Sequence, residues 1–282
     1  MTDPATGQVG SPDGPARAGP SGLLVVDLGP GVRAAFTGRR AVPPDATTGR
    51  PGVGGNLGLG VGDDPGEVRR RRRDLAAWAG GAVSWTTQVH GTAVALASAR
   101  PDAAASHPAV GHDGVGPVAE ADALVAVGGG AGAAVVVADC VPVLLADPVA
   151  GVAAAVHAGR RGLADGVVQA AVHAMGRHGA RVSRVRAAVG PAICGACYEV
   201  PAALRDEVAA VVPWVASRTS WGTPALDLPA GVVAVLRGLG VEHVQETRLC
   251  TYTDDRYFSH RRSGATGEPE GRFAAVVRIA AP

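Results

Sequence analysis

Short apolar runs separated by glycine or Asp-Pro turns dominate the middle of the chain. Four of these runs are rich in Val and Ala and follow one another closely, at 123–127, 133–138, 141–146 and 152–156. Continuous apolar runs of this length, bounded by turn residues, are typical of buried strands. Further strands are predicted at 23–28, 32–36, 83–89, 92–96, 186–189, 243–247 and 273–279, with 83–89 and 92–96 paired to each other.

Helices are predicted where capping residues precede apolar positions at helical spacing. Asp64 as N-cap, Pro65 in the first turn and Glu67 at the capping-box position predict a helix that runs to about Trp78. Three further helices are expected, at 162–178, 202–212 and 229–239. Residues 100–119 are polar and contain proline, which indicates a loop insertion.

This order of strands and helices, without an internal repeat, predicts an α/β fold. We expect a single domain over residues 21–282, with mixed sheets flanked by helices. Residues 1–20 are rich in Gly, Pro, Ala and Ser and are expected to form a disordered tail. They lack the basic start and apolar stretch of a signal peptide, so a cytoplasmic protein is expected.

Composition removes several classes of function. The 282 residues carry 26 basic and 25 acidic side chains, a net charge of +1, so no strong attraction to nucleic acid or anionic membrane is expected. The arginine run 69–73 is interpreted as a solvated helix face. The sequence contains no lysine, which excludes Schiff-base and Walker-type phosphate chemistry. No apolar run reaches the roughly 18 residues that span a bilayer, and four cysteines do not make a disulfide scaffold.

Three segments place a side chain able to bind metal at the edge of an apolar run. They carry His90, Cys140 and His157, a sound ligand set for Zn²⁺ with a fourth position open to water or substrate. The same atoms allow a second interpretation, in which Cys140 is a nucleophile, His157 its general base and Asp139 an orienting carboxylate. The sequence does not separate the two, because both need a thiolate.

Arginines near these segments suit a reaction that involves phosphate, because a guanidinium binds phosphate through two hydrogen bonds. Arg161 follows His157 closely and is expected, with Arg160, to line the same cleft. Arg39 and Arg262 are further candidates. Cys194 and Cys197 form a CxxC without a second CxxC, and we interpret them as incidental thiols.

The order of several short motifs resembles the laccase-domain family, known both as polyphenol-oxidase-like proteins and as purine nucleoside phosphorylases. The resemblance covers about residue 23 to the C-terminus. The matching stretches include Asn56-Leu57-Gly58, Gln88-Val89-His90-Gly91, Ala121-Asp122-Ala123, Ala138-Asp139-Cys140-Val141-Pro142, His157-Ala158-Gly159, Gly190-Pro191-Ala192-Ile193, Tyr198-Glu199-Val200, Cys250-Thr251-Tyr252 and Phe258-Ser259 with Arg261-Arg262.

The resemblance implies a single domain of laccase-domain, cysteine-hydrolase-like architecture, with zinc bound by His90, Cys140 and His157. It implies phosphorolysis of adenosine, inosine, guanosine and methylthioadenosine to the base and ribose 1-phosphate or its methylthio analogue, with adenosine deaminase side activity. Phosphate would be held by Arg39 or Arg161, and Asp139 or Glu199 would move a proton. The partners are then purine nucleosides and phosphate, and the chain would act as a monomer or small homo-oligomer.

Two alternatives stay open beside the phosphorylase. Cys140 and His157 could form a hydrolase acting on amides or peptidoglycan precursors, a role to which some bacterial relatives are linked. The zinc could instead be structural and the protein a binding module. Copper occurs among the metals discussed for the family, but multicopper oxidase chemistry is discounted. The chain has eight histidines without a His-x-His pair, and its methionines are Met1 and Met175.

Two positions depart from the family pattern. Arg160 stands where the family usually has Trp, and His260 where it usually has Tyr. Replacing a flat apolar ring with a charge weakens stacking on a purine, so these departures are expected to alter substrate preference and to leave metal binding intact.

Overall fold

The computed structural model describes residues 23–40, 53–98 and 117–280. The expected tail at 1–20 and most of the expected loop at 100–119 lie outside these ranges. The predicted fold class, α/β with mixed sheets flanked by helices, is confirmed.

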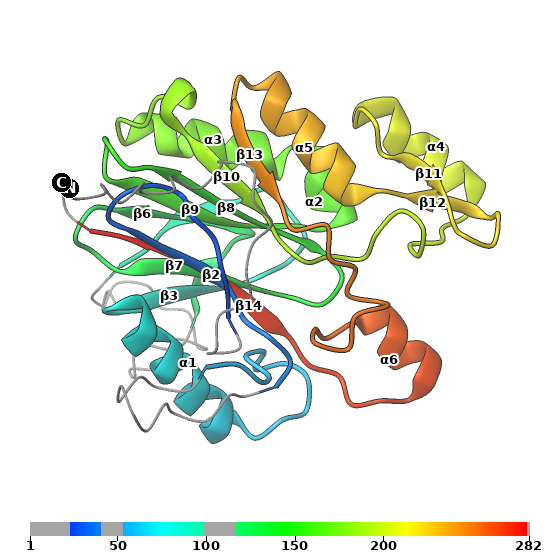
Figure 1. Ribbon diagram of the computed structural model, residues 1–282, viewed down its shortest axis with the longest axis horizontal. Coiled ribbons are helices and arrows are strands. Elements are labelled where there is room, and N and C mark those ends of the chain that lie inside the picture. The colour runs from blue at the N-terminus through cyan, green and yellow to red at the C-terminus, as the bar shows by residue number, and fades with distance from the viewer. Residues whose placement is uncertain (1–22, 41–52, 99–116, 281–282) are drawn as a thin grey trace, which may run out of the picture.

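Within the described ranges, two mixed sheets of six strands each form the centre of the fold (Figure 1). The first sheet has the spatial order β1 (Leu24–Val25), β2 (Val32–Phe36), β14 (Phe273–Ile279), β7 (Gly132–Val137), β3 (Val83–Thr87) and β5 (Pro117–Glu120). The second sheet has the order β13 (His243–Glu246), β10 (Arg186–Val189), β8 (Val141–Asp147), β9 (Val152–Ala158), β6 (Ala123–Val127) and β4 (Val94–Leu96). A third, two-stranded sheet pairs β11 (Ala216–Arg218) with β12 (Pro224–Leu226).

Helices cover the outer faces of both sheets. Helix α1 (Pro65–Ala79) packs on the first sheet, and α3 (Val167–Arg177) with α5 (Leu228–Gly238) packs on the second (Figure 1). The other helices of the described residues are the short α2 (Arg160–Asp165), α4 (Ala202–Val211) and α6 (His260–Thr266), with a 3₁₀ turn at Val182–Arg184.

Apolar side chains on both faces of the central strands explain this layering. In β8, Leu144 belongs to the core between the two sheets, whereas Val143 and Leu145 belong to the core beneath the helices. Successive residues of a strand point to opposite faces, so a strand that is apolar throughout needs cover on both sides. This accounts for the Val-rich runs, and the four predicted central strands are present as β6 to β9.

The expected pairing of 83–89 with 92–96 is wrong. Strand β3 pairs in parallel with β5 and β7 of the first sheet, whereas β4 pairs in parallel with β6 of the second. The chain between them therefore crosses from one sheet to the other and carries His90 at the crossing. Residues 117–119 of the expected loop belong to strand β5 (Pro117–Glu120) and not to a loop.

The helix expected at 162–178 is two helices. It starts earlier, at Arg160, and Gly166 adopts a left-handed conformation with φ of 97°, which ends α2 and begins α3. A left-handed residue ends a helix, and glycine adopts this conformation without a steric penalty. The predicted N-cap of α1 is confirmed, since the Asp64 side chain accepts a hydrogen bond from the Glu67 backbone N–H at 2.8 Å.

The arginine run on α1 is only partly a solvated face. Arg70 bonds Glu67 and Asp74 at the surface, as expected. Arg72, by contrast, is 4% exposed: its guanidinium lies 4.1 Å from the ring centroid of Trp85 and donates to the Leu57 carbonyl. A buried guanidinium needs hydrogen-bond acceptors, and an aromatic face adds a favourable cation–π contact; Arg72 has both.

Candidate metal centre and its cavity

Strand register brings Cys140 and His157 together. Strands β8 and β9 are antiparallel, with Pro142 opposite His157, so Cys140 just before β8 lies beside the end of β9. The register of β6 with β9 places Ala123 opposite Val156. Asp122, immediately before β6, accordingly reaches His157, whose backbone N–H donates to the Asp122 carbonyl at 2.8 Å.

His90 reaches the same place from the crossing between the two sheets. It has a φ of 61°, in the left-handed region that non-glycine residues rarely adopt. The Asp122 carboxylate fixes this turn by accepting from the backbone N–H groups of His90 at 2.9 Å and Gly91 at 2.7 Å, and more weakly from that of Val89.

The ligand atoms of His90, Cys140 and His157, hereafter the His-Cys-His group, all lie within 4.8 Å of one another. Cys140 Sγ is 3.8 Å from His90 Nε2, and the two imidazole rings meet edge to face with centroids 4.8 Å apart. Zinc–sulfur and zinc–nitrogen bonds of about 2.3 and 2.0 Å at a tetrahedral angle would put the sulfur and nitrogen atoms about 3.5 Å apart. The residues therefore fit a metal ion that binds two imidazoles and a thiolate.

Asp122 orients the His157 ring of this group through a hydrogen bond. Its Oδ1 is 2.8 Å from His157 Nδ1, and both side chains are almost fully buried. This hydrogen bond leaves His157 Nε2 to face Cys140, the arrangement by which a carboxylate fixes the tautomer of a metal-binding histidine. Burial raises the pKa of Asp122, but the bonds from His157 and the backbone outweigh it and hold that pKa below its usual value.

Cys140 and His157 also form a charged pair. Burial alone raises the pKa of the Cys140 thiol, but the charge of His157 and hydrogen bonds with both histidines lower it to about 6. Burial lowers the pKa of His157, whereas the Cys140 thiolate and Asp122 raise it to about 9. Both shifts favour a thiolate–imidazolium pair in the metal-free protein.

The group opens into a cavity of about 480 Å³. Its wall combines three histidines and two arginines with small and apolar residues: His90, His157, His260, Arg72, Arg272, Cys140, Gln88, Thr86, Thr87, Gly58, Leu59, Gly60, Val61, Pro117, Val136, Val137 and Ala138. The volume lies in the range of about 300–1,000 Å³ that is typical of small-molecule sites. His260, one of the two departures from the family pattern, thus faces the candidate site.

Comparison with known proteins identifies the family. A family model described as multi-copper polyphenol oxidoreductase laccase matches residues 34–280. The chain belongs to this laccase-domain family. A Streptomyces coelicolor protein named purine nucleoside phosphorylase is 50% identical over 220 residues, covering 77% of this chain and 86% of that protein. A Mycobacterium tuberculosis protein of the same name is 45% identical over 225 residues, covering 79% and 83%.

Solved structures agree with the laccase-domain assignment. A Neisseria meningitidis protein of this type is 31% identical with a TM-score of 0.73, covering 92% of this chain and 99% of that one. YlmD from Geobacillus stearothermophilus is 28% identical with a TM-score of 0.72, covering 93% of this chain and 94% of its own. The sequence resemblance to the family is therefore confirmed.

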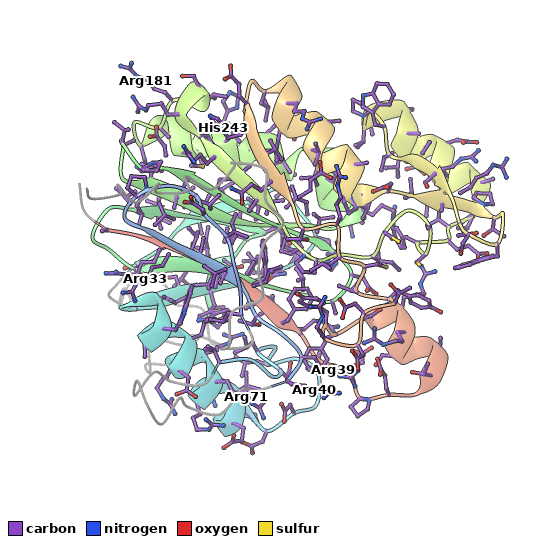
Figure 2. The ribbon with its side chains drawn as sticks, viewed as in Figure 1. Arg33, Arg39, Arg40, Arg71, Arg181 and His243 are labelled. Atoms are coloured by element: carbon purple, nitrogen blue, oxygen red, sulfur yellow. The ribbon has the colours of Figure 1, made fainter. Side chains whose placement is uncertain are left out.

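The structure places the candidate arginines of this laccase-domain chain around α6 and α2. Arg39, which follows β2 (Figure 2), and Arg262 on α6 both pair with Glu268, at 2.8 and 2.7 Å. Arg262 also donates to the carbonyls of Thr251 and Tyr257. Arg161 is exposed on α2 and is not among the residues that line the cavity.

Asp139 is buried behind the site, with both carboxylate oxygens engaged. Oδ1 accepts from the Thr251 hydroxyl, and Oδ2 accepts from the Arg261 backbone N–H at 2.7 Å. Asp139 therefore holds the start of α6 next to Cys140. Glu199, the other expected proton carrier, accepts a hydrogen bond from the indole of Trp221 at 2.7 Å.

The sequence alone assigns no role in the site to Asp122, Arg72 or Arg272, and it marks His260 only as a departure from the family pattern. Asp122 had a signal: a lone carboxylate at the start of a fully apolar strand is rarely buried without a partner. His260, the first residue of α6, had its departure from the family pattern as a signal. Arg272 had none, because it reaches the cavity from the segment between α6 and β14, whose course depends on the tertiary fold.

The His-Cys-His group tolerates no added atom at Gly159. A Cβ at this position would lie 2.6 Å from His90 Cδ2 and 3.2 Å from Cys140 Sγ. We expect Gly159→Ala to displace His90 and to weaken the binding of added Zn²⁺, used as a probe metal, about 10–100-fold, the usual cost of disturbing a ligand's support. Zinc affinity is measured by competition with a chromophoric chelator.

Gly176→Ala is the matched control, because a Cβ there meets nothing within 4 Å. It should leave zinc affinity unchanged and raise the free energy of unfolding by up to about 1 kcal/mol through helix propensity. Equal zinc affinity in Gly159→Ala and wild-type protein would contradict the described packing.

The pKa of Cys140 predicts a distinctive pH profile of alkylation. In protein stripped of metal by a chelator, the rate of Cys140 carbamidomethylation by iodoacetamide should rise with a midpoint near pH 6. For an unperturbed thiol the midpoint lies at a pH of about 8.5. A lowered pKa means that the reactive thiolate persists down to this pH and is lost by protonation below it. Peptide mass mapping follows Cys140 separately from the other cysteines, and a midpoint at 8 or above would refute the thiolate–imidazolium pair.

Among the described residues, every helix is too short or too polar to cross a membrane.

Proposed function

We propose that this chain is a zinc-dependent purine nucleoside phosphorylase. It would convert adenosine, inosine, guanosine and methylthioadenosine, with phosphate, into the base and ribose 1-phosphate or its methylthio analogue, with adenosine deaminase as a side activity. The observation that carries the proposal is the His-Cys-His group in the wall of a 480 Å³ cavity with basic side chains. The relatives named purine nucleoside phosphorylase support the choice of substrate.

Zinc suits this ligand set because it accepts both imidazole and thiolate and retains an open position. His90, Cys140 and His157 would hold it, and Asp122 would keep His157 in the required tautomer. When bound, zinc supplies Lewis acidity and lowers the pKa of coordinated water to about 7, the chemistry that deamination at purine C6 requires.

Phosphorolysis needs a phosphate held against the sugar. One phosphate oxygen forms a bond to C1′ while the bond from C1′ to the purine nitrogen breaks, and the electron pair leaves with the base. Positive charge develops on the ribose, so the phosphate dianion is both nucleophile and stabiliser. The site must therefore offer phosphate a basic side chain that is not already neutralised by a carboxylate.

Arg272 lines the cavity and is the arginine best placed for this role. Its guanidinium donates to the Gly271 carbonyl at 2.8 Å and makes only a long, 3.4 Å contact with Glu270. Arg39 and Arg262 are committed to Glu268, which leaves Arg161, exposed on α2, as a further proposed phosphate contact. Arg72 contributes positive charge from its place against Trp85.

The departing base must take up a proton. His260 lines the cavity, and its Nδ1 is 2.8 Å from Glu270 Oε1, which leaves Nε2 as the second proton site of the ring. We propose His260 as the proton donor to the base. Asp139 then acts as a positioning residue, since its oxygens are engaged by Thr251 and Arg261.

The thiolate–imidazolium pair supports one alternative, a Cys140 hydrolase acting on amides or peptidoglycan precursors. In that case Cys140 would attack a carbonyl carbon and His157 would protonate the leaving amine. Zinc would inhibit such an enzyme, whereas the phosphorylase needs zinc.

We further propose a cytoplasmic monomer or small homo-oligomer that binds neither nucleic acid nor membrane, consistent with its net charge of +1.

Chromatography of adenosine incubated with purified, zinc-loaded protein tests the proposal. Adenine and ribose 1-phosphate formed only with phosphate would establish phosphorolysis, and inosine formed with or without phosphate would establish deamination. The absence of all three products from folded, zinc-loaded protein would refute both activities.

A further inference from the structure

Three of the four cysteines gather at a second place in the fold. The Sγ atoms of Cys194, Cys197 and Cys250, hereafter the three-cysteine cluster, lie within 4.8 Å of one another. All three are free thiols; Cys197 is buried and the other two are half-buried. Cys250 comes from a segment 56 residues after Cys194, so the cluster is a product of tertiary folding.

Backbone geometry holds these thiols as a set. Cys194 to Cys197 form a tight turn, in which the Cys194 carbonyl accepts from the N–H groups of Cys197 at 2.9 Å and Tyr198 at 3.0 Å. The Cys194 backbone N–H donates to Cys250 Sγ at 3.5 Å. N–H···S bonds of this kind favour the thiolate, because the donor stabilises charge on sulfur.

Glycine at residue 195 lets this turn pack closely against Ser217 and Asp227. A Cβ at Gly195 would lie 2.6 Å from Ser217 Oγ and 2.7 Å from Asp227 Cβ. The second segment is fixed to the first by a parallel bridge between Ala192 and Cys250, with Thr251 N–H bonded to the Ala192 carbonyl at 3.0 Å. Both segments are therefore rigidly placed before any ion binds.

We propose that the three-cysteine cluster is a second metal site, separate from the His-Cys-His group, for a sulfur-preferring ion of the Zn²⁺ or Cu⁺ type. Three thiolates complete the trigonal coordination that suits Cu⁺, or three corners of the zinc tetrahedron with an outside ligand at the fourth. A CxxC turn with a third cysteine from a distant segment provides this set of soft donors.

The position of the cluster gives the bound ion a structural role. Ile193, next to Cys194, donates its backbone N–H to the Asp139 carbonyl at 3.0 Å, and Thr251, next to Cys250, donates to the Asp139 carboxylate. Asp139 directly precedes Cys140. An ion in the three-cysteine cluster would join the two segments that support this turn, and metal binding should raise thermal stability whether or not the chain is a phosphorylase.

The test uses the double variant His90→Ala with Cys140→Ala, which removes two ligands of the first site. Reduced protein is titrated with Co²⁺ under exclusion of oxygen, and thiolate-to-cobalt absorption in the near ultraviolet reports sulfur ligation. We expect saturation at about one ion per chain, as one tetrahedral site requires. Adding Cys250→Ser should abolish this absorption or strongly weaken it. Competition of Zn²⁺ and Cu⁺ for chromophoric chelators then identifies the preferred ion.

Alkylation provides a readout that does not depend on the serine variant folding. In the double variant, Zn²⁺ or Cu⁺ should protect Cys194, Cys197 and Cys250 from N-ethylmaleimide and raise the melting temperature, as followed by peptide mapping and circular dichroism. Absence of both sulfur-to-cobalt absorption and protection would overturn the proposal. So would a disulfide between two of these cysteines in protein isolated without oxidant, since that pair could not bind metal.

Discussion

Asp122→Asn is expected to weaken zinc binding by about 10–100-fold and to lower the free energy of unfolding by about 2–4 kcal/mol. One carboxylate accepts hydrogen bonds from the backbone of His90 and Gly91 and from the His157 ring. An amide has one acceptor oxygen and two N–H donors, so at least one buried partner would meet a donor instead of an acceptor. Chelator competition and urea denaturation measure the two effects.

The control for Asp122→Asn is Asp206→Asn. Asp206 is an exposed carboxylate on α4, bonded to Arg205, and surface ion pairs contribute little to stability. This variant should match wild-type protein within about 0.5 kcal/mol. If Asp122→Asn behaved like the control, then Asp122 would not orient the metal ligands.

Cys140→Ala is expected to abolish phosphorolysis, with a loss in kcat/KM on the order of 10³-fold or more, because the variant removes the only thiolate ligand of the site. Cys140→Ser should fail in the same way, since a hydroxyl keeps the size of the side chain but is a poor zinc ligand at neutral pH. The steady-state rate of adenine release from adenosine with phosphate measures the effect.

The metal-free forms of wild-type and Cys140→Ala protein should have similar circular dichroism spectra, which separates loss of the site from loss of the fold. Retention of more than about a tenth of the phosphorolysis rate in Cys140→Ala would contradict the assignment of Cys140, given the size of effect expected for a lost metal ligand.

Local patterns predicted the elements whose neighbours are close in sequence. The four central strands lie close together in sequence, so their apolar runs identify them, and the hairpin of β8 with β9 sets the register that joins Cys140 to His157. The N-cap hydrogen bond of Asp64 joins residues three positions apart and was equally predictable from the sequence. In both cases the deciding interactions lie within a short stretch of chain.

Features set by distant contacts were not predictable in this way. Strands β3 and β4 resemble a hairpin in sequence, but their partners lie in different sheets. Arg72 sits in a run of five arginines, and only the position of Trp85 shows that it is the buried one. Gly166 is one of 41 glycines, and its helix-breaking φ depends on how α2 and α3 pack.

The residues of the candidate site differ in the same way in how far the sequence could predict their roles. His90, Cys140 and His157 were recognisable as residues able to bind metal at strand edges, and the fold brings all three together. Asp122 stood in one of the matching motifs, but the sequence did not indicate its role, because that role depends on its carboxylate accepting three or more hydrogen bonds at once. Cys250 gave no signal as a partner of the CxxC, since nothing in local sequence relates residues 56 positions apart.

One measurement tests the central claim most directly: the rate of phosphorolysis and the protection of Cys140 from iodoacetamide, determined in the same samples across a zinc titration of metal-free protein. If zinc in the His-Cys-His group supports the reaction, the rate and the protected fraction of Cys140 will rise together and saturate together. Full protection of Cys140 without phosphorolysis, or phosphorolysis by protein whose Cys140 is fully alkylated, would contradict the account.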